Sequence, residues 1–213
     1  MTQIISQLKT LRVIPVAVVE RAEDAIPLAD TLVKGGLPCV EIMLRRPAAV
    51  EAIRMLSHRS DILVGAGTVL TIEQVDAAME AGARFVVSPG FNPKVADYCI
   101  RNRIFHFPGV CTPTEIEAAL DLGLHIFKFF PAEACGGLDY LVAISGPYND
   151  VEYIPTGGIN AGNLARYLQF SKVLACGGTW IAGEALIRSG RFEDILSNTR
   201  QAAAIARNCS QAI

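Results

Sequence analysis

The chain has 213 residues, of which 51% are hydrophobic and 19% are charged, and its formal net charge at pH 7 is -2. A chain of this length and composition can bury one sizeable core, so we expect a single globular domain over residues 1–213. The balanced charge, without a basic run, argues against nucleic acid or an anionic membrane as a partner, and no signal peptide or transmembrane stretch is predicted.

Cysteine usage points to a reducing compartment. The six cysteines form neither a CxxC pair nor a Cys/His pattern with the spacing of metal ligands: Cys39, Cys99, Cys111, Cys135, Cys176 and Cys209. Free thiols explain them best, so we expect a cytoplasmic protein with no metal and no other cofactor.

Short β-branched runs alternate with alanine-rich segments of helical periodicity along the chain. The runs predict strands at Val13–Val19, Pro38–Leu44, Ile62–Gly65, Phe85–Ser88, Ile104–Pro108, His125–Phe130, Val151–Pro155 and Val173–Gly177. The segments between them predict helices, among them Ala22–Lys34, Ala48–His58, Ile72–Ala81 and Pro113–Leu122. This alternation predicts a parallel α/β protein, and roughly 25 residues per unit favour a single (β/α)8 TIM barrel over an open sheet. A short helix is expected before the first strand.

Capping signals mark several helix ends. Two threonines stand three residues before Gln or Glu, as in a capping box: Thr71 and Thr112. Glycines follow three helical segments and are expected to end them in the left-handed conformation: Gly35, Gly82 and Gly123.

Two lone charges interrupt apolar strands. Lys128 lies at the centre of His125–Phe130, and Glu41 lies within Pro38–Leu44. A parallel strand is covered on both faces, where desolvation makes a charge costly. Both strands are even-numbered, so inward side chains share interior layers and the two charges are expected to meet. They form either a buried ion pair that only fills the core, at little net gain in stability, or a catalytic pair.

Glycine pairs follow the seventh and eighth predicted strands, at Gly157–Gly158 and Gly177–Gly178. Glycine lets backbone N–H groups approach an anion, and barrels commonly hold phosphate at these two exits. The pairs therefore predict a phosphate cradle, with ordinary tight turns as the alternative. Arg45, four residues after Glu41, could direct its guanidinium at a carboxylate.

Seven motifs, in order along the chain, carry a resemblance to a known family. They are Glu41-x-x-Leu44-Arg45, Gly65-Ala-Gly-Thr68, Ser88-Pro-Gly90, Phe107-Pro-Gly-Val, Phe127-Lys128-Phe-Phe-Pro-Ala-Glu133, Pro155-Thr-Gly-Gly-Ile159 and Gly177-Gly-Thr-Trp180. Together they resemble the 2-keto-3-deoxy-6-phosphogluconate (KDPG) and 4-hydroxy-2-oxoglutarate (KHG) aldolases. The resemblance implies a metal-free class I aldolase, a homotrimer of (β/α)8 barrels. Its phosphorylated keto-acid substrate, KDPG, is cleaved to pyruvate and glyceraldehyde 3-phosphate, as in the Entner–Doudoroff pathway.

The resemblance also implies roles for single residues. Lys128 would form the Schiff base, Glu41 would shuttle protons, and Arg45 would bind the substrate carboxylate. The other substrate-binding positions that it implies are Thr68, Pro89, Phe130, Thr156, Gly157, Gly158, Gly178 and Thr179. Met43 and Arg46 depart from the family pattern, since many relatives have threonine there, and Arg46 could add an anion contact.

Burial disfavours the charged form of a lysine, which frees an amine lone pair to attack the C2 ketone and form an iminium. A touching Glu41 would oppose that effect. Three alternatives stay open. The same chemistry could act on KHG or on the galactonate epimer of KDPG. A barrel isomerase or epimerase could use Glu41 and Lys128 as acid and base. The third alternative is a sugar-phosphate binding protein without catalysis.

Overall fold

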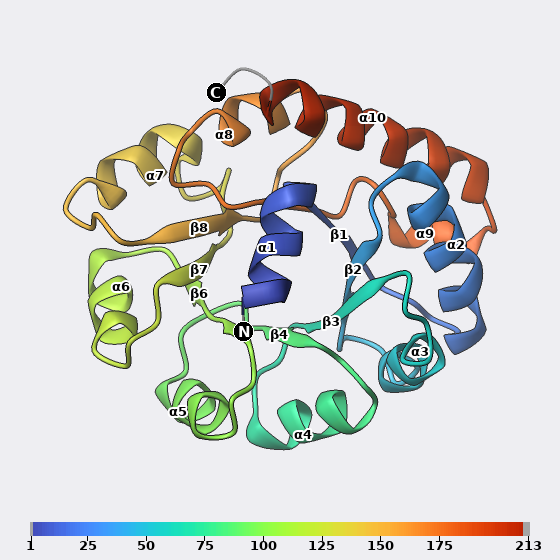
Figure 1. The fold of residues 1–213 in the computed structure, drawn as a ribbon, viewed down its shortest axis with the longest axis horizontal. Coiled ribbons are helices and arrows are strands. Elements are labelled where there is room, and N and C mark those ends of the chain that lie inside the picture. Colours follow the sequence, from blue (N-terminus) through green and yellow to red (C-terminus); the bar gives the residue numbers. More distant parts are fainter. Residues whose placement is uncertain (1, 211–213) are drawn as a thin grey trace.

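In a computed structural model, residues 2–210 are described, and parallel strands at the centre are surrounded by helices (Figure 1). The strands are β1 (Val13–Ala17), β2 (Cys39–Met43), β3 (Leu63–Gly67), β4 (Phe85–Val87), β5 (His106–Phe107), β6 (Gly109–Val110), β7 (Ile126–Phe129), β8 (Glu152–Pro155) and β9 (Cys176–Gly178). The helices are α1 (Thr2–Leu11), η1 (Ala22–Asp24), α2 (Ala25–Gly35), α3 (Ala49–Leu56), α4 (Ile72–Glu80), α5 (Pro93–Arg101), α6 (Pro113–Leu120), α7 (Gly137–Ser145), α8 (Leu164–Leu168), α9 (Glu184–Arg188) and α10 (Phe192–Ser210).

All pairings between these strands are parallel. Six strands form one sheet in the order β5-β4-β3-β2-β1-β9, and three form a second sheet in the order β6-β7-β8. Two isolated parallel bridges, Tyr153 to Val173 and Thr156 to Gly177, connect the β8 side of the second sheet to the β9 side of the first. The predicted parallel α/β class is confirmed.

The strand predicted at Ile104–Pro108 is shorter in the structure, where β5 spans only His106–Phe107 and a separate strand, β6, follows Pro108. Pro108 separates β5 from β6, because proline has no N–H to donate to a sheet ladder. The third predicted strand continues past Gly65 to Gly67, since its glycines still pair with β2. The last strand is Cys176–Gly178 rather than Val173–Gly177.

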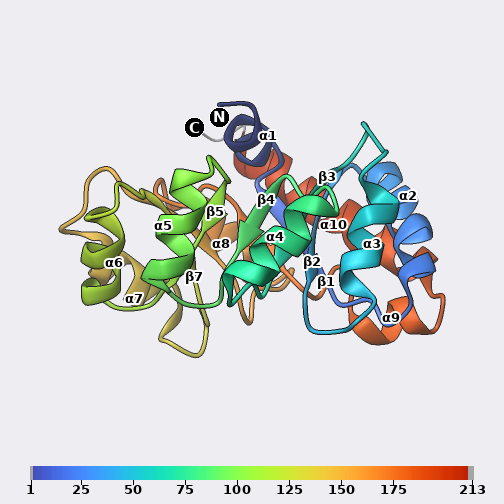
Figure 2. The same ribbon diagram turned by 90° about the horizontal axis from the view of Figure 1, so that it is seen from below.

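The expected N-terminal helix is present as α1, which lies on one side of the strand layer (Figure 2). Its Ile4 and Leu8 pack into a buried cluster with inward side chains of the strands, among them Ile14, Phe85 and Phe107. The helix therefore covers one end of the strands, and the carboxyl ends that carry the candidate site lie at the other end. In residues 2–210, no helix is long and apolar enough to cross a bilayer.

Helix starts follow the predicted caps with one difference. The capping box at Thr112 and Glu115 is confirmed, since each side chain accepts from the backbone of the other residue. Thr71 Oγ1 accepts from the Gln74 N–H at 3.3 Å. The Gln74 side chain, however, accepts from the Leu70 N–H at 2.7 Å, one residue before Thr71.

Helix ends are glycine caps at two of the three predicted positions. Gly82 and Gly123 have φ angles of 97° and 74° and are confirmed. The prediction for Gly35 is wrong. Gly35 is the last residue of α2, and Gly36, with φ of 90°, is the left-handed cap. A Cβ on Gly35 would lie 2.4 Å from Thr199 Cγ2, so this glycine instead permits the close approach of α10.

Candidate active site

A single buried ion pair joins β2 and β7. The Nζ of Lys128 lies 3.3 Å from Oε1 of Glu41, and the two side chains are 6% and 3% exposed. The two strands are not paired with each other, because Glu41 aligns with Val16 and Gly65 while Lys128 aligns with Gly109 and Ile154. Their side chains therefore meet inside the structure. This contact was predicted because β2 and β7 correspond to the second and sixth strands expected from the sequence, and inward side chains of even-numbered strands share interior layers.

A glycine makes room for the carboxylate. A Cβ on Gly67 would lie 2.1 Å from Oε1 of Glu41, whereas a Cβ on Gly65 would strike the ring of Phe85 at 2.2 Å. Of the two glycines in this strand, only Gly67 thus serves the ion pair directly. The sequence carried a signal that the prediction missed, since glycine inside a strand often marks such a close approach.

The residue after that glycine has an unusual backbone. Thr68 follows β3 with φ of 60°, in the left-handed region that a β-branched residue rarely adopts. Backbone conformations of this kind cost about 1–3 kcal/mol and gather at functional sites. Arg12 and Arg103 share this conformation before β1 and β5, so the angle alone assigns Thr68 no role; its position directly after Gly67 places it next to the residue that accommodates Glu41.

Phe130 and Pro89 border the strand exits. The Nζ of Lys128 lies 5.3 Å from the ring centroid of the half-buried Phe130. Pro89 follows β4, and its carbonyl oxygen would be only 2.1 Å from a Cβ on Gly109, so this loop lies directly against β6. Phe130 is therefore beside the amine of Lys128, and Pro89 belongs to a tightly packed loop at the same end of the strands.

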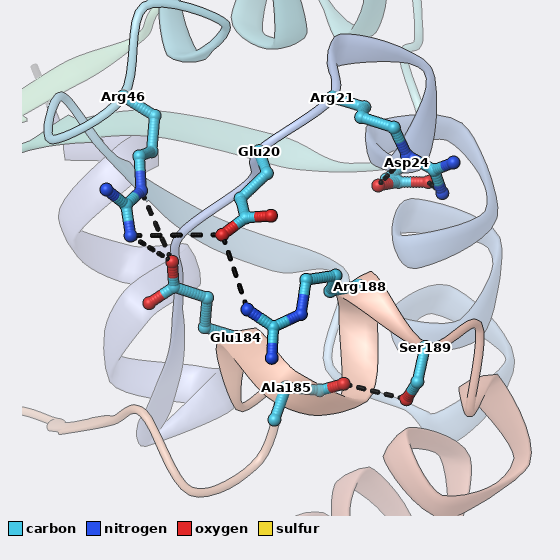
Figure 3. Close-up of polar contacts among 8 residues, drawn as sticks. All are labelled: Glu20, Arg21, Asp24, Arg46, Glu184, Ala185, Arg188 and Ser189. Atoms are coloured by element: carbon cyan, nitrogen blue, oxygen red, sulfur yellow. Dashed lines mark hydrogen bonds and ion pairs between the residues drawn. The ribbon is translucent and has the colours of Figure 1, made fainter.

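Two neighbouring arginines after β2 have different surroundings. Arg45 is exposed and takes part in none of the ion pairs among the described residues. Arg46 donates to Oε1 of Glu184 from Nη2 at 2.6 Å and from Nε at 3.3 Å (Figure 3). The guanidinium of Arg45 thus has no carboxylate partner among the described residues, whereas that of Arg46 has one. Met43, the other departure from the family pattern, is buried.

The glycine pair after β8 needs glycine for local reasons as well. Gly157 and Gly158 have φ angles of 97° and 84°, and a Cβ on Gly158 would lie 2.6 Å from Cβ of Glu133. Glu133 N–H donates to the Gly157 carbonyl at 3.0 Å, which joins this turn to the segment after Lys128. Sequence reasoning assigned Glu133 no place in the site. The tight-turn interpretation is therefore correct for the conformation, and it leaves the anion-binding role open.

The remaining predicted residues lie at the same ends of β8 and β9. Thr156 is buried, and its Oγ1 donates to the Ile154 carbonyl at 3.3 Å. Gly178 ends β9, and Thr179 after it is exposed. The structure therefore places Lys128 beside both Glu41 and Phe130 and arranges the others on neighbouring strand exits.

A cavity elsewhere in the structure does not coincide with the candidate site. A cavity of about 350 Å³ lies between the amino-terminal ends of β5 and β7, lined mainly by apolar side chains, and it includes neither Lys128 nor Glu41. Among residues 2–210, no group of three His, Cys, Asp or Glu side chains is placed to hold a metal ion. The buried ion pair, rather than cavity size, marks the candidate site.

Residues 4–197 match the family model described as "Aldolase: KDPG and KHG aldolase". This chain belongs to the KDPG and KHG aldolase family. A 2-dehydro-3-deoxy-phosphogluconate aldolase of Treponema pallidum is 46% identical over 202 residues, which cover 94% of this chain and 96% of the relative. The KHG/KDPG aldolase of Escherichia coli K12 is 41% identical over 198 residues, covering 92% and 93%.

A solved structure of this aldolase family shows the same fold. The KDPG aldolase of Legionella pneumophila has a TM-score of 0.90 to this chain at 39% identity, covering 94% of this chain and 98% of that one. It is described with pyruvate captured at low pH as a covalent carbinolamine intermediate. That relative therefore forms the kind of covalent adduct that a buried lysine can make.

Proposed function

We propose that this chain is a class I aldolase that cleaves KDPG to pyruvate and glyceraldehyde 3-phosphate. The observation that carries the proposal is the buried contact of 3.3 Å between Lys128 Nζ and Glu41 Oε1 in a member of the KDPG and KHG aldolase family. A buried pair contributes little net stability, so its chemistry is the better reason for its presence.

Proton transfer within the pair can generate the neutral amine and the carboxylic acid that the reaction needs. Transfer of one proton from Lys128 to Glu41 along their hydrogen bond leaves a neutral amine and a neutral carboxylic acid. The amine lone pair then attacks the C2 ketone of the substrate and forms a carbinolamine. The acid protonates the departing hydroxyl, which leaves as water, and the product is an iminium.

The iminium drives the cleavage. Glu41, now a carboxylate, takes the proton of the C4 hydroxyl, and the electrons of the C3–C4 bond flow into the iminium to give an enamine and the aldehyde. Protonation of the enamine carbon by the same group and hydrolysis of the imine release pyruvate. One carboxyl group thus serves as acid and base in turn, which its contact with Lys128 makes possible.

Residues on the strand exits would hold the two ends of the substrate. The exposed guanidinium of Arg45 would bind the C1 carboxylate, with Thr68, Pro89, Phe130 and Thr156 around the pyruvyl part. Backbone N–H groups of Gly157, Gly158 and Gly178 and the hydroxyl of Thr179 would bind the phosphate.

We also infer the finer architecture. The bridges between the β8 and β9 sides, together with the single-residue step at Pro108 from β5 to β6, support closure into one (β/α)8 TIM barrel, as a single domain over residues 1–213. Family resemblance supports a homotrimer. Six free cysteines support a reducing, cytoplasmic location.

KHG is the second candidate substrate, because the Escherichia coli relative is named for both activities. The cradle at Gly157, Gly158 and Gly178 favours the phosphorylated substrate, since a short dicarboxylate would leave it unused.

Borohydride trapping tests the proposal. Reduction in the presence of pyruvate is expected to add a reduced pyruvyl group to the peptide that contains Lys128, as read by mass spectrometry. Lys128→Arg should lose both the adduct and the cleavage of KDPG, because a guanidinium stays protonated. Lys94→Arg, at an exposed lysine, is the matched control and should keep both. An adduct on Lys94 or Lys172, or none at all, would contradict the assignment.

A further inference from the structure

Four side chains of alternating charge gather at the carboxyl ends of β1, β2 and β9 (Figure 3). Arg46 Nη2 lies 2.6 Å from Glu184 Oε1 and 3.9 Å from Glu20 Oε1. Arg188 Nη1 lies 3.6 Å from the same Glu20 oxygen. The cluster thus links the loops after β1 and β2 to helix α9, and Arg46 and Glu184 are 138 positions apart in the sequence.

The cluster neutralises its own charges. Arg46 holds the pKa of Glu184 below its ordinary value, mainly through their hydrogen bond, and Arg188 and Glu20 add smaller contributions in the same direction. Two guanidinium groups face two carboxylates, so the cluster offers no free charge to a substrate. The anion contact suggested for Arg46 is therefore not favoured, in contrast to its neighbour Arg45, which has no ion pair among the described residues.

Folding stability does not explain these contacts well. The side chains of Arg46, Glu184, Glu20 and Arg188 are 47%, 36%, 34% and 63% exposed, and ion pairs exposed to this extent contribute little to the free energy of unfolding. Such a pair can still fix a geometry. Nε and Nη2 of Arg46 both donate to one oxygen of Glu184, which sets the orientation of the guanidinium.

The pair joins the loops assigned to the two ends of the substrate. Arg46 is adjacent to Arg45, which would bind the carboxylate, and Glu184 begins α9 five residues after Thr179, which would bind the phosphate. A substrate anchored at both ends is oriented only if the two anchors keep a fixed separation. The Arg46–Glu184 bond provides such a constraint.

We propose that Arg46 and Glu184 form a clamp that fixes Arg45 relative to Thr179, so that Arg46 is a positioning residue for substrates that carry both a carboxylate and a distant phosphate. This inference rests on the proposed function. It predicts an effect on doubly anchored substrates and little effect on substrates that end before the β9 loop.

Steady-state kinetics with two substrates test the clamp. Arg46→Gln and Glu184→Gln should each raise KM for KDPG roughly three- to fivefold, because an exposed pair can contribute up to about 1 kcal/mol to holding the two anchors in place. With 2-keto-4-hydroxybutyrate, which has no phosphate, KM should change less than about twofold, because only one anchor is in use. The double variant Arg46→Glu/Glu184→Arg restores the ion pair with its charges exchanged, so its KM for KDPG should lie closer to the wild-type value than that of either single variant.

Controls separate the clamp from folding and from the aldolase chemistry. Arg54→Gln removes a similarly exposed ion pair, with Glu51 on α3, and should leave both KM values unchanged. Arg46→Gln should still give the borohydride-trapped pyruvyl adduct at Lys128. Absence of that adduct in the wild-type protein would contradict the proposed aldolase reaction rather than the clamp. Equal changes of KM for the two substrates, or no change for KDPG, would overturn the clamp.

Discussion

Lys128 and Glu41 make a buried contact of 3.3 Å across 87 residues of sequence, from two strands that do not pair with each other. Each side chain is about as buried as the apolar residues beside it. Removing two charges from water costs free energy that their mutual attraction only partly offsets. Under the proposed function the contact is the means by which one proton is moved between amine and carboxylate.

Replacement of Glu41 tests its role as proton carrier. Glu41→Gln keeps the size and the hydrogen-bonding capacity of the side chain but removes the group that gains and loses a proton. We expect turnover of KDPG to fall by roughly 10²–10⁴ while pyruvate binding is largely kept. Glu152→Gln, which breaks an exposed pair with Lys9, is the control and should retain full turnover. An unchanged rate in Glu41→Gln would assign proton transfer to water or to another group.

Turnover should be sensitive to substitution of Gly67 as well as of Glu41, the residue that Gly67 accommodates. The Cβ in Gly67→Ala would lie 2.1 Å from Oε1 of Glu41, so the carboxylate must move away from Lys128. We expect a loss of roughly 10²-fold in turnover with the fold intact, measured by steady-state kinetics and circular dichroism. Gly90→Ala is the matched control, because no atom lies within 4 Å of a Cβ at that position. Full activity in Gly67→Ala would show that Glu41 need not occupy this place.

The sequence was sufficient for the parts of the fold that depend on local pattern. Alternation of apolar runs and helical segments predicted the parallel α/β class, and lone charges in strands predicted that Glu41 and Lys128 meet. Errors arose where the deciding contact is distant in sequence. Gly35 was predicted as a left-handed cap because nothing local shows that α10 packs on it through Thr199. The Arg46–Glu184 bond was missed for the same reason.

His106 gives the stability of the protein a predictable dependence on pH. Ser88 Oγ donates to the Val69 carbonyl at 2.7 Å, so it must accept from Nε2 of His106 at 2.8 Å. Nδ1 of His106 is then a bare acceptor, buried without a partner among the described residues. Protonation would add a second N–H with no acceptor, and burial lowers the pKa of His106 from 6.5 to about 4.

A lowered histidine pKa means that the unfolded chain binds the proton first as pH falls. The contribution of neutral His106 is complete above about pH 6.5 and is lost progressively between pH 6.5 and 4, by an amount on the order of 3 kcal/mol. His106→Gln, which retains a donor for Ser88, should flatten the free energy of unfolding across this window. The exposed His125→Gln should not, as urea titrations at several pH values would show. Parallel curves for His106→Gln and wild type would contradict this prediction.

The last prediction concerns the phosphate end of the substrate. Valine at Gly158 would be strained at φ of 84° and would meet Glu133, so Gly158→Val should displace the turn and raise KM for KDPG. The same strain is expected to lower the stability of the fold. Thr179→Val is therefore the companion variant, because it removes only an exposed hydroxyl at constant shape. It should raise KM for KDPG roughly five- to tenfold and leave kcat/KM for 2-keto-4-hydroxybutyrate unchanged, since that substrate never reaches β9. Thr10→Val, at an exposed threonine of α1, should change neither value. Equal losses on both substrates for Gly158→Val, with none for Thr179→Val, would mean that the glycines serve only as turns and would favour KHG as the substrate.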